Sequence, residues 1–389
     1  MFFIDKPYIS DFLKETLVKY SIPVVTTKAR ACFTLHDKTL QTSEQDAITA
    51  LNAGSAKAYS TSENAIAWFE EHVPEANILK TINLFKDKAA FRQQIASLYP
   101  DFFFTEVAVT DLAQLDYKSL PKSFIIKPTV GFFSMGVYLV ESVEAWQETL
   151  LKIDKEMQDV AGLYPEQVLK TGNFIIEECI EGEEFAIDAY FDEAGCVHVV
   201  GIFQHQFAGA DDVSDRVYFT SKELIEEHLE TFTALAQQIG KLCKTTNFPM
   251  HLEVRKRSDG VIVPIEVNPL RFGGWCTTAD CSATAFGFNP YQMYFEGKTP
   301  NWQEVLKGKE GKKYCLVVLD NSTGVAGENI RHFDYDKLTS SFSTPLEIRK
   351  IDWLEYPVFG FLFAEVSDDS WHQIETILAS DLTEFITTT

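Results

Sequence analysis

The segment from His251 to Asn268 constrains the fold of this chain more than any other. It contains Asp259-Gly260, a dipeptide that favours a two-residue hairpin turn because both central residues need positive φ. Such a turn places Glu253 opposite Glu266 and His251 opposite Asn268, all on one face. A four-residue turn would keep that face, whereas a three-residue turn would not. The other, core-facing side is expected to carry Leu252, Val254, Ile265 and Val267.

Two carboxylates that face each other across a hairpin repel, since their Cβ atoms lie about 5 Å apart. A divalent cation between them removes that repulsion. Glu253 and Glu266, with the amide oxygen of Asn268, are the hard oxygen ligands that magnesium prefers, and nucleotide phosphates would complete its coordination. A solvated charged face is the simpler alternative, but it leaves the pairing and the adjacent asparagine unexplained. We therefore predict a magnesium site on this hairpin.

The composition excludes several classes of protein. The chain has 389 residues, 46% of them apolar and 23% charged, which is typical of a globular protein of two or three domains. A formal charge of −23 disfavours nucleic acids and anionic membranes, because no basic stripe is left to neutralise phosphates. The sequence has no apolar run of membrane-spanning length, no signal-peptide pattern and no paired cysteine motif. We expect a cytoplasmic protein without nucleic-acid or membrane partners.

Local patterns predict a mixed α/β chain. Ser10 is expected to cap a helix between two short strands, which gives a small N-terminal unit without a glycine-rich phosphate loop. One helix is expected to run from Asn83 through Ile95, and Thr220 with Glu223 is expected to cap another. Residues 312–389 read as a smaller α/β part without a motif. Strands are predicted at 2–4, 23–26, 124–127, 137–140, 174–178, 184–191 and 197–206.

A lysine-bearing strand and a loop precede the hairpin in the sequence. Phe124-Ile-Ile-Lys127 is followed by the loop 128–136. A lysine at the end of a buried strand suits α- and β-phosphates as a point charge, although such a side chain often only extends into water. Gly131 and Gly136 let the backbone bend, so that amides and the Ser134 hydroxyl can approach phosphates.

Taken together, these segments resemble the ATP-grasp superfamily. The two glutamates followed by Asn-Pro-Leu-Arg-Phe-Gly-Gly are similar to the metal-binding end of that family, and the lysine strand and loop are similar to its phosphate-covering segment. The loop departs from glycine-richer versions by carrying Phe132 and Phe133. The resemblance covers about residues 80–290. It implies an ATP-grasp fold with an N-terminal α/β pre-ATP-grasp domain (1–80), an ATP-grasp domain (81–300) and a C-terminal α/β part (301–389).

The resemblance also implies nucleotide contacts. Lys88, which follows Asp87 at the head of a helix, and Lys127 would bind phosphates, with Lys86 as a competitor for Lys88. The segment 174–185 is similar to the adenine hinge of the family, although alone it reads as an acidic surface strand. By position, the adenine contacts would be Glu177, Glu178 and Ile180, and the ribose contact would be Glu184.

For activity, the resemblance implies a ligase that uses ATP and Mg²⁺, with Mn²⁺ as a substitute. A carboxylate would attack the γ-phosphate to give ADP and an acyl phosphate, and an amine or amino acid would then displace phosphate. Such phosphoryl transfer needs positioning and charge neutralisation more than covalent help, so metal ligands and cations are the expected parts. The partners would be small-molecule carboxylate and amine substrates, and a homodimer is compatible with the family.

Arg271 and His251 are the candidate catalytic residues. Arg271, beside two glycines, can pair bidentately with a substrate carboxylate or its acyl phosphate, the alternative being a surface ion pair. His251 stands where some relatives have an arginine, and its role stays open between a charged donor and a packed strand histidine. The polar loop 204–216 is expected to line the acceptor site. In that loop, Arg216 is a candidate for a second carboxylate and its acidic neighbours are candidates for attracting an amine.

Three other functions remain open on the sequence alone. An ATP-grasp kinase would phosphorylate a small molecule without ligation, since a fold does not settle a function. A nucleotide-binding sensor would bind ATP without turnover, although such a protein need not keep both metal ligands. An enzyme that modifies a protein or peptide terminus would require a macromolecular acceptor. Trapping of an acyl phosphate with hydroxylamine separates the ligase from the kinase.

Overall fold

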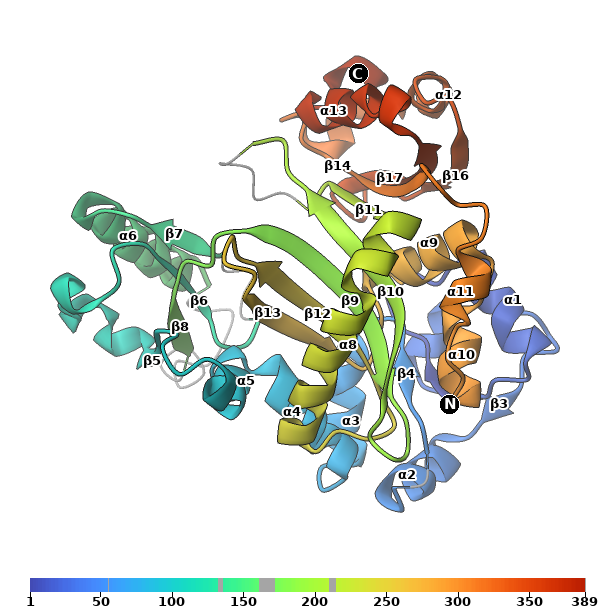
Figure 1. Ribbon diagram of the computed structural model, residues 1–389, viewed down its shortest axis with the longest axis horizontal. Coiled ribbons are helices and arrows are strands. Elements are labelled where there is room, and N and C mark those ends of the chain that lie inside the picture. Colours follow the sequence, from blue (N-terminus) through green and yellow to red (C-terminus); the bar gives the residue numbers. More distant parts are fainter. Residues whose placement is uncertain (55, 132–135, 161–171, 210–214, 389) are drawn as a thin grey trace.

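The computed structural model describes residues 1–54, 56–131, 136–160, 172–209 and 215–388. It is a mixed α/β fold around one large sheet, with the C-terminal part at the top of Figure 1 and the N-terminal unit at the lower right. All pairings in the large sheet are antiparallel. Its eight strands run in the order β13 (Ile262–Pro269), β12 (Phe248–Lys256), β9 (Glu183–Phe191), β10 (Val197–Gln206), β11 (Val217–Ser221), β14 (Lys313–Asp320), β17 (Val358–Val366) and β16 (Pro345–Lys350).

Three smaller sheets surround the large one. The N-terminal sheet is parallel, and a four-stranded antiparallel sheet lies at the left of Figure 1. The N-terminal sheet has the order β3 (Gln41–Thr42), β2 (Val24–Val25), β1 (Phe2–Phe3) and β4 (Tyr59–Ser60). The antiparallel sheet has the order β5 (Phe104–Ala108), β8 (Asn173–Glu178), β6 (Phe124–Pro128) and β7 (Tyr138–Val140). The third sheet pairs β15 (Ile330–Phe333) with β18 (Ile386–Thr388).

Helices cover the sheets. In the described ranges, no helix has the length and apolar character needed to cross a bilayer. All seven cysteines are free thiols, as their scattered spacing indicates. The α-helices are α1 (Asp11–Lys19), α2 (Glu44–Asn52), α3 (Ile66–His72), α4 (Asn77–Lys86), α5 (Lys88–Ile95), α6 (Val143–Val160), α8 (Lys222–Cys243), α9 (Thr277–Phe286), α10 (Pro290–Glu296), α11 (Trp302–Val305), α12 (Tyr335–Ser340) and α13 (His372–Ala379).

The cap predicted at Ser10 is confirmed, because its hydroxyl accepts a hydrogen bond from the Leu13 amide at 3.1 Å. Two other helix predictions are wrong. The single helix expected through residue 87 is two helices, since Asp87 has extended φ/ψ and its carboxylate accepts from the amides of the next helix. Asp caps helix starts better than it continues helices. The later helix is capped by Ser221, one residue beyond Thr220.

The hairpin between β12 and β13 has the predicted pairing at the carboxylates but not the predicted turn. Gly260 donates to the Arg257 carbonyl at 2.9 Å and has a φ of +83°, so three residues, not two, close the turn. Near the turn, Val254 pairs with Pro264. A β-bulge at Ile265 then adds one residue to β13 and restores the facing of Glu253 and Glu266. Ile265 therefore does not lie in the core as predicted but is half-buried and lines a cavity.

The C-terminal part is joined to the rest by the large sheet itself. β11 pairs with β14 over five residues, so the sheet continues through the boundary expected at residue 300. The N-terminal unit and the central sheet share one apolar core, in which the Phe2 ring stacks on Tyr59 at 4.7 Å. A second core lies under β14 and β17, and a third lies under the sheet of β5 to β8. The region around the hairpin therefore lies where three packed units meet (Figure 1).

Candidate active site

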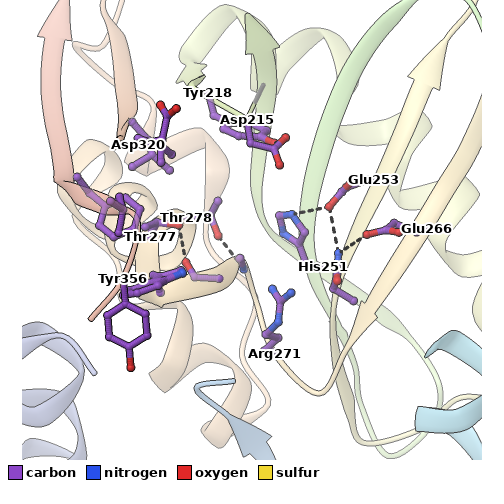
Figure 2. A pocket seen from close by; sticks show the side chains of 18 of the residues that line it. Asp215, Tyr218, His251, Glu253, Glu266, Arg271, Thr277, Thr278, Asp320 and Tyr356 are labelled. Atoms are coloured by element: carbon purple, nitrogen blue, oxygen red, sulfur yellow. Dashed lines mark hydrogen bonds and ion pairs between the residues drawn. The ribbon is translucent and has the colours of Figure 1, made fainter. Parts of the chain in front are cut away.

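The facing carboxylates of β12 and β13 form the centre of the candidate site. The Asn268 amide donates to Glu253 at 3.0 Å and to Glu266 at 3.3 Å (Figure 2). Burial, and then repulsion from Glu266, raises the pKa of Glu253 well above its ordinary value. A divalent cation would relieve this repulsion, so the donor set fits the predicted magnesium. The described residues contain no group of three His, Cys, Asp or Glu side chains able to hold a metal, so phosphate or water oxygens must complete the coordination.

Two lysines approach these carboxylates. Lys88, the first residue of α5, places its Nζ 3.0 Å from Glu266. Burial raises the pKa of Glu266, but Lys88 and Lys127 outweigh this and lower it to about 2. Lys86, the competing candidate, forms an ion pair with Glu63. The turn at Asp87 separates the two neighbouring lysines, and it is Lys88 that reaches the predicted metal ligands.

A buried ion-pair network holds Lys127, the lysine predicted to bind phosphates. Glu177 is 3% exposed, and its two oxygens accept from Arg92 Nε at 2.6 Å and pair with Lys127 Nζ at 3.0 Å. Through these contacts Glu177 fixes Lys127, and its predicted adenine contact stays a prediction. Arg92 was not predicted from the sequence, although it lies four residues after Lys88 and thus on the same face of the helix.

A cavity of about 470 Å³ lies between the β6–β8 sheet and the hairpin. Arg255 closes one side, donating to Glu184 at 2.9 Å and to the Ile180 carbonyl at 2.7 Å. Gly131 and Gly136 do not line this cavity, and Ser134, Phe132 and Phe133 lie outside the described residues. Of the predicted site residues, the cavity brings together Lys127, Glu177, Glu178, Ile180, Glu184, Glu253 and Glu266.

A second cavity of about 460 Å³ lies on the other side of the facing carboxylates. The segment after β13 contributes Arg271, whose guanidinium donates to Glu63 at 2.8 Å and to the Phe272 carbonyl at 2.9 Å. Figure 2 shows Arg271 and the two glutamates projecting from neighbouring elements toward this space. Part of the remaining wall is apolar and comes from the C-terminal strands β14 and β17: Leu316, Val318, Val358 and Phe361. Thr277, Thr278 and Asp320 make other parts of the wall polar.

His251 lines this second cavity and is held from behind. Its Nδ1 lies 2.7 Å from the wholly buried Asp188, and its Nε2 lies 3.6 Å from Glu253. Asp188 also accepts from the Gly273 amide at 3.0 Å, so one carboxylate positions both the histidine and the glycine segment. His251 is therefore neither solvated nor packed only against apolar neighbours. Asp188 carried no motif in the sequence; its contacts come from pairing of β9 with β12.

Arg216 does not serve the role considered for it. Its guanidinium donates to Asp320 at 2.9 Å and to the Ser322 hydroxyl at 2.7 Å. It also donates to the carbonyls of Ile377 in α13 and of Ser380 just after it. These contacts tie β11 to the C-terminal part and use the donors that a substrate carboxylate would need. Asp211 and Asp212 lie outside the described residues. Asp215 is described, and it lines both cavities.

The segment after Arg271 connects the site to the C-terminal part. Trp275 and Cys276 both have left-handed backbone, with φ of 57° and 58°, which is uncommon for residues other than glycine. Arg349 of β16 donates to the Cys276 carbonyl at 3.4 Å and to the buried Asp280 at 2.7 Å. The Trp275 ring packs edge-on against Tyr356 at 5.1 Å. Residues 312–389, which showed no motif, thus supply part of the cavity wall and the arginine, Arg349, that holds the segment after Arg271 in place.

Comparison with solved structures shows the same overall fold in several enzymes. The L-amino acid ligase from Bacillus licheniformis superposes with a TM-score of 0.69 at 16% identity, over 100% of this chain and 98% of that one. The N5-carboxyaminoimidazole ribonucleotide synthetase from Thermotoga maritima gives 0.63 at 12%, over 100% and 99%. The biotin carboxylase domain dimer of Hydrogenobacter thermophilus 2-oxoglutarate carboxylase, in complex with MgADP, ADP and bicarbonate, gives 0.62 at 12%, over 100% and 90%.

Comparisons of the sequence are narrower. The curated proteins contain no match to it. The family of ATP-grasp domains matches residues 120–279, from just before β6 to the start of α9. This range contains Lys127, the hinge segment and the facing carboxylates, which are the residues that suggested the family. Residues 120–279 therefore match the model of an ATP-grasp domain, and the whole chain shares its fold with the enzymes named above.

Proposed function

We propose that this protein is an ATP-dependent carboxylate–amine ligase that releases ADP and phosphate. The observation that carries the proposal is the position of Glu253 and Glu266, which line both cavities at once. A nucleotide in one cavity and a carboxylate in the other would meet at these side chains, next to Lys88 at 3.0 Å from Glu266. The likeness to an L-amino acid ligase over nearly the full length supports the assignment.

The nucleotide would occupy the cavity next to β6 and β8. Lys127, fixed by Glu177 at 3.0 Å, and Lys88 would neutralise phosphate charge. Glu178 and the Ile180 backbone would bind the adenine edge, and Glu184 the ribose. Magnesium held by Glu253, Glu266 and Asn268 would neutralise the charge that develops on the transferred phosphoryl group. This arrangement supplies positioning and charge stabilisation, which are the main needs of phosphoryl transfer.

Two bond exchanges complete the reaction. A carboxylate oxygen, oriented by Arg271, attacks the γ-phosphorus, and the bond to ADP breaks. The amine nitrogen then attacks the acyl carbon, and the bond to phosphate breaks with its electron pair on phosphate. Of the two protons that an ammonium substrate loses, one ends on phosphate and one passes to solvent. His251, held by Asp188 at 2.7 Å, faces the glutamate side of this space and would orient the groups there.

The proposal is tested by measuring phosphate release from Mg-ATP with a matrix of carboxylic acids and amino acids. ADP and phosphate that appear only when an acid and an amine are both present support the ligase. Neutral hydroxylamine in place of the amine should trap the acyl phosphate as a hydroxamate. Phosphate transfer to a stable product without ligation would instead support a kinase, and confirmed ATP binding without any turnover would support a sensor.

Three finer features belong to the proposal. Mn²⁺ is expected to replace Mg²⁺, because both accept carboxylate and water ligands. A homodimer is expected, and the dimer in one of the similar structures supports it. Small-molecule acids and amines in the cytoplasm are the expected substrates, since cavities of about 460 and 470 Å³ have the size of small-ligand sites.

A further inference from the structure

The two cavities share three side chains, all of them carboxylates. Glu253, Glu266 and Asp215 line both. The first two face each other on the hairpin, whereas Asp215 comes from the segment just before β11. The three do not form a group able to hold one metal ion within the described part of the chain. Asp215 therefore stands at the place where acyl phosphate would form, without being a third metal ligand.

The Asp215 carboxylate is held in place by one neighbour. The Tyr218 hydroxyl donates to its Oδ1 at 2.7 Å. Tyr218 is itself fixed, because its ring stacks on His205 with centroids 4.4 Å apart. Among the described residues, no Lys or Arg forms an ion pair with Asp215, whereas the neighbouring Asp320 is paired with Arg216 at 2.9 Å. Asp215 is thus an oriented, solvent-exposed negative charge that the protein does not neutralise.

The rest of the second cavity has a complementary pattern. Figure 2 shows Asp215 and Arg271 on opposite sides of the space, with His251 and the glutamates between them at one edge. β14 and β17 supply an apolar patch of this wall, and Asp320 at the end of β14 is paired with Arg216. A cavity with Arg271 as its cation, an exposed Asp215 on the opposite side and an apolar patch fits a substrate pair in which an acid binds at the cation and an ammonium group at Asp215.

Resting on the proposed ligase function, we propose that Asp215 binds the ammonium group of the amine substrate, and that this amine is an amino acid with an apolar side chain. The carboxylate orients the nitrogen at the junction of the cavities, where it can reach the acyl carbon bound near Arg271. The side chain of the amine packs on the wall of Leu316, Val318, Val358 and Phe361. The charge at Asp215 selects a substrate that carries an ammonium group, and Tyr218 keeps that charge in place.

The test compares a charged amine with an uncharged nucleophile in Asp215→Asn. The wild type is first assayed with alanine, valine, leucine, phenylalanine and aspartate as amines, and the apolar amino acids should be used better than aspartate. For the best amine, Asp215→Asn should raise KM or lower kcat/KM by about tenfold to hundredfold, as expected for a lost charged hydrogen bond. With hydroxylamine at mildly alkaline pH, where it is neutral, the hydroxamate rate and the KM values for acid and ATP should stay within about twofold of wild type.

Three further variants make the result specific. Asp215→Glu should recover part of the amine KM, and Tyr218→Phe should give a smaller rise of the same kind. Asp336→Asn removes one exposed charge on α12 and should change nothing. An unchanged amine KM in Asp215→Asn, or a rise confined to the acid KM, would overturn the inference while leaving the ligase intact. Absence of ADP and hydroxamate in the wild type with every acid would instead overturn the proposed function.

Discussion

The two cavities of the candidate site differ in how they are built. The first cavity, which we propose for the nucleotide, is lined by short stretches of sequence around Lys127, Glu178 and Glu266. Two of its charged groups are paired within the protein, Lys127 with Glu177 and Glu266 with Lys88. The second cavity takes residues from β12, from the segment around Arg271 and from strands more than forty residues further on. A cofactor that many enzymes use can be bound by compact sequence motifs. The site for a particular substrate is instead formed by distant residues that the fold places next to those motifs.

This difference indicates which changes affect both cavities and which affect one. Glu253 and Glu266 belong to both, so their loss should stop the reaction whichever substrate is used. Arg271 lines the second cavity, and Arg349 holds the segment behind it through the Cys276 carbonyl. We expect the largest effect from the glutamates that both cavities share and smaller effects from these two arginines.

Glu266→Gln should lower turnover of Mg-ATP by at least about 10³-fold, because the change removes a metal ligand and the partner of Lys88 at 3.0 Å. The fold should remain intact, since the side chain is half-buried beside a cavity and Gln has nearly the same shape. Phosphate release and thermal unfolding are the measurements. Glu365→Gln, which removes a carboxylate paired with Lys312 in the C-terminal part, is the matched control. Turnover close to that of wild type in Glu266→Gln would disprove the metal assignment.

Arg349→Met should lower the free energy of unfolding by about 3–5 kcal/mol, because it leaves Asp280 as a buried charge without its partner. The two side chains are each 2% exposed. Burial raises the pKa of Asp280 to about 6 even though Arg349 opposes the rise. Without Arg349 the pKa should rise further. The folded state then binds a proton that the unfolded state has lost, so stability should fall as pH rises from about 4 through 6 and beyond.

Urea unfolding of Arg349→Met at several pH values measures this dependence. The double variant Arg349→Met with Asp280→Asn should recover part of the loss at neutral pH, because the buried charge is gone. A loss of stability that does not change with pH would show that packing, and not the charge of Asp280, dominates. Arg349 also holds the Cys276 carbonyl at 3.4 Å. The activity that remains in the variant should therefore show a raised KM for the acid and the amine and an unchanged KM for ATP.

The contrast between the cavities also sets what the sequence could predict. The facing of Glu253 and Glu266 and the cap at Ser10 are confirmed, because alternation along a strand and capping chemistry are local properties. The predicted two-residue turn was wrong. A three-residue turn shifts the register of the hairpin, and a bulge at Ile265 shifts it back. Nothing in the local pattern marks a bulge, since its cost and benefit depend on how β13 pairs with β12.

Long-range contacts account for the other differences. Arg92 reaches Glu177 across 85 residues, and Arg216 reaches Asp320 across 104, so neither pair has a sequence spacing that predicts it. Arg216 looked like a free cation in a polar loop, but β11 pairs with β14 and places it against the C-terminal part. The break at Asp87 was readable, since Asp before a run of helix formers favours an N-cap.

Arg271→Ala should give the smallest of the three effects and separate the cavities most directly. The guanidinium lines the second cavity and not the first, so the KM for the carboxylate should rise about tenfold to hundredfold, whereas the KM for ATP should change by less than about threefold. Its present partner, Glu63, also binds Lys86, so that carboxylate keeps one cation and the fold should survive. Arg271→Lys should recover only part of the loss, because an ammonium cannot pair bidentately. Equal increases in both KM values would mean that Arg271 holds the structure between the two cavities and does not bind the carboxylate. The second cavity would then have no assigned cation for the acid.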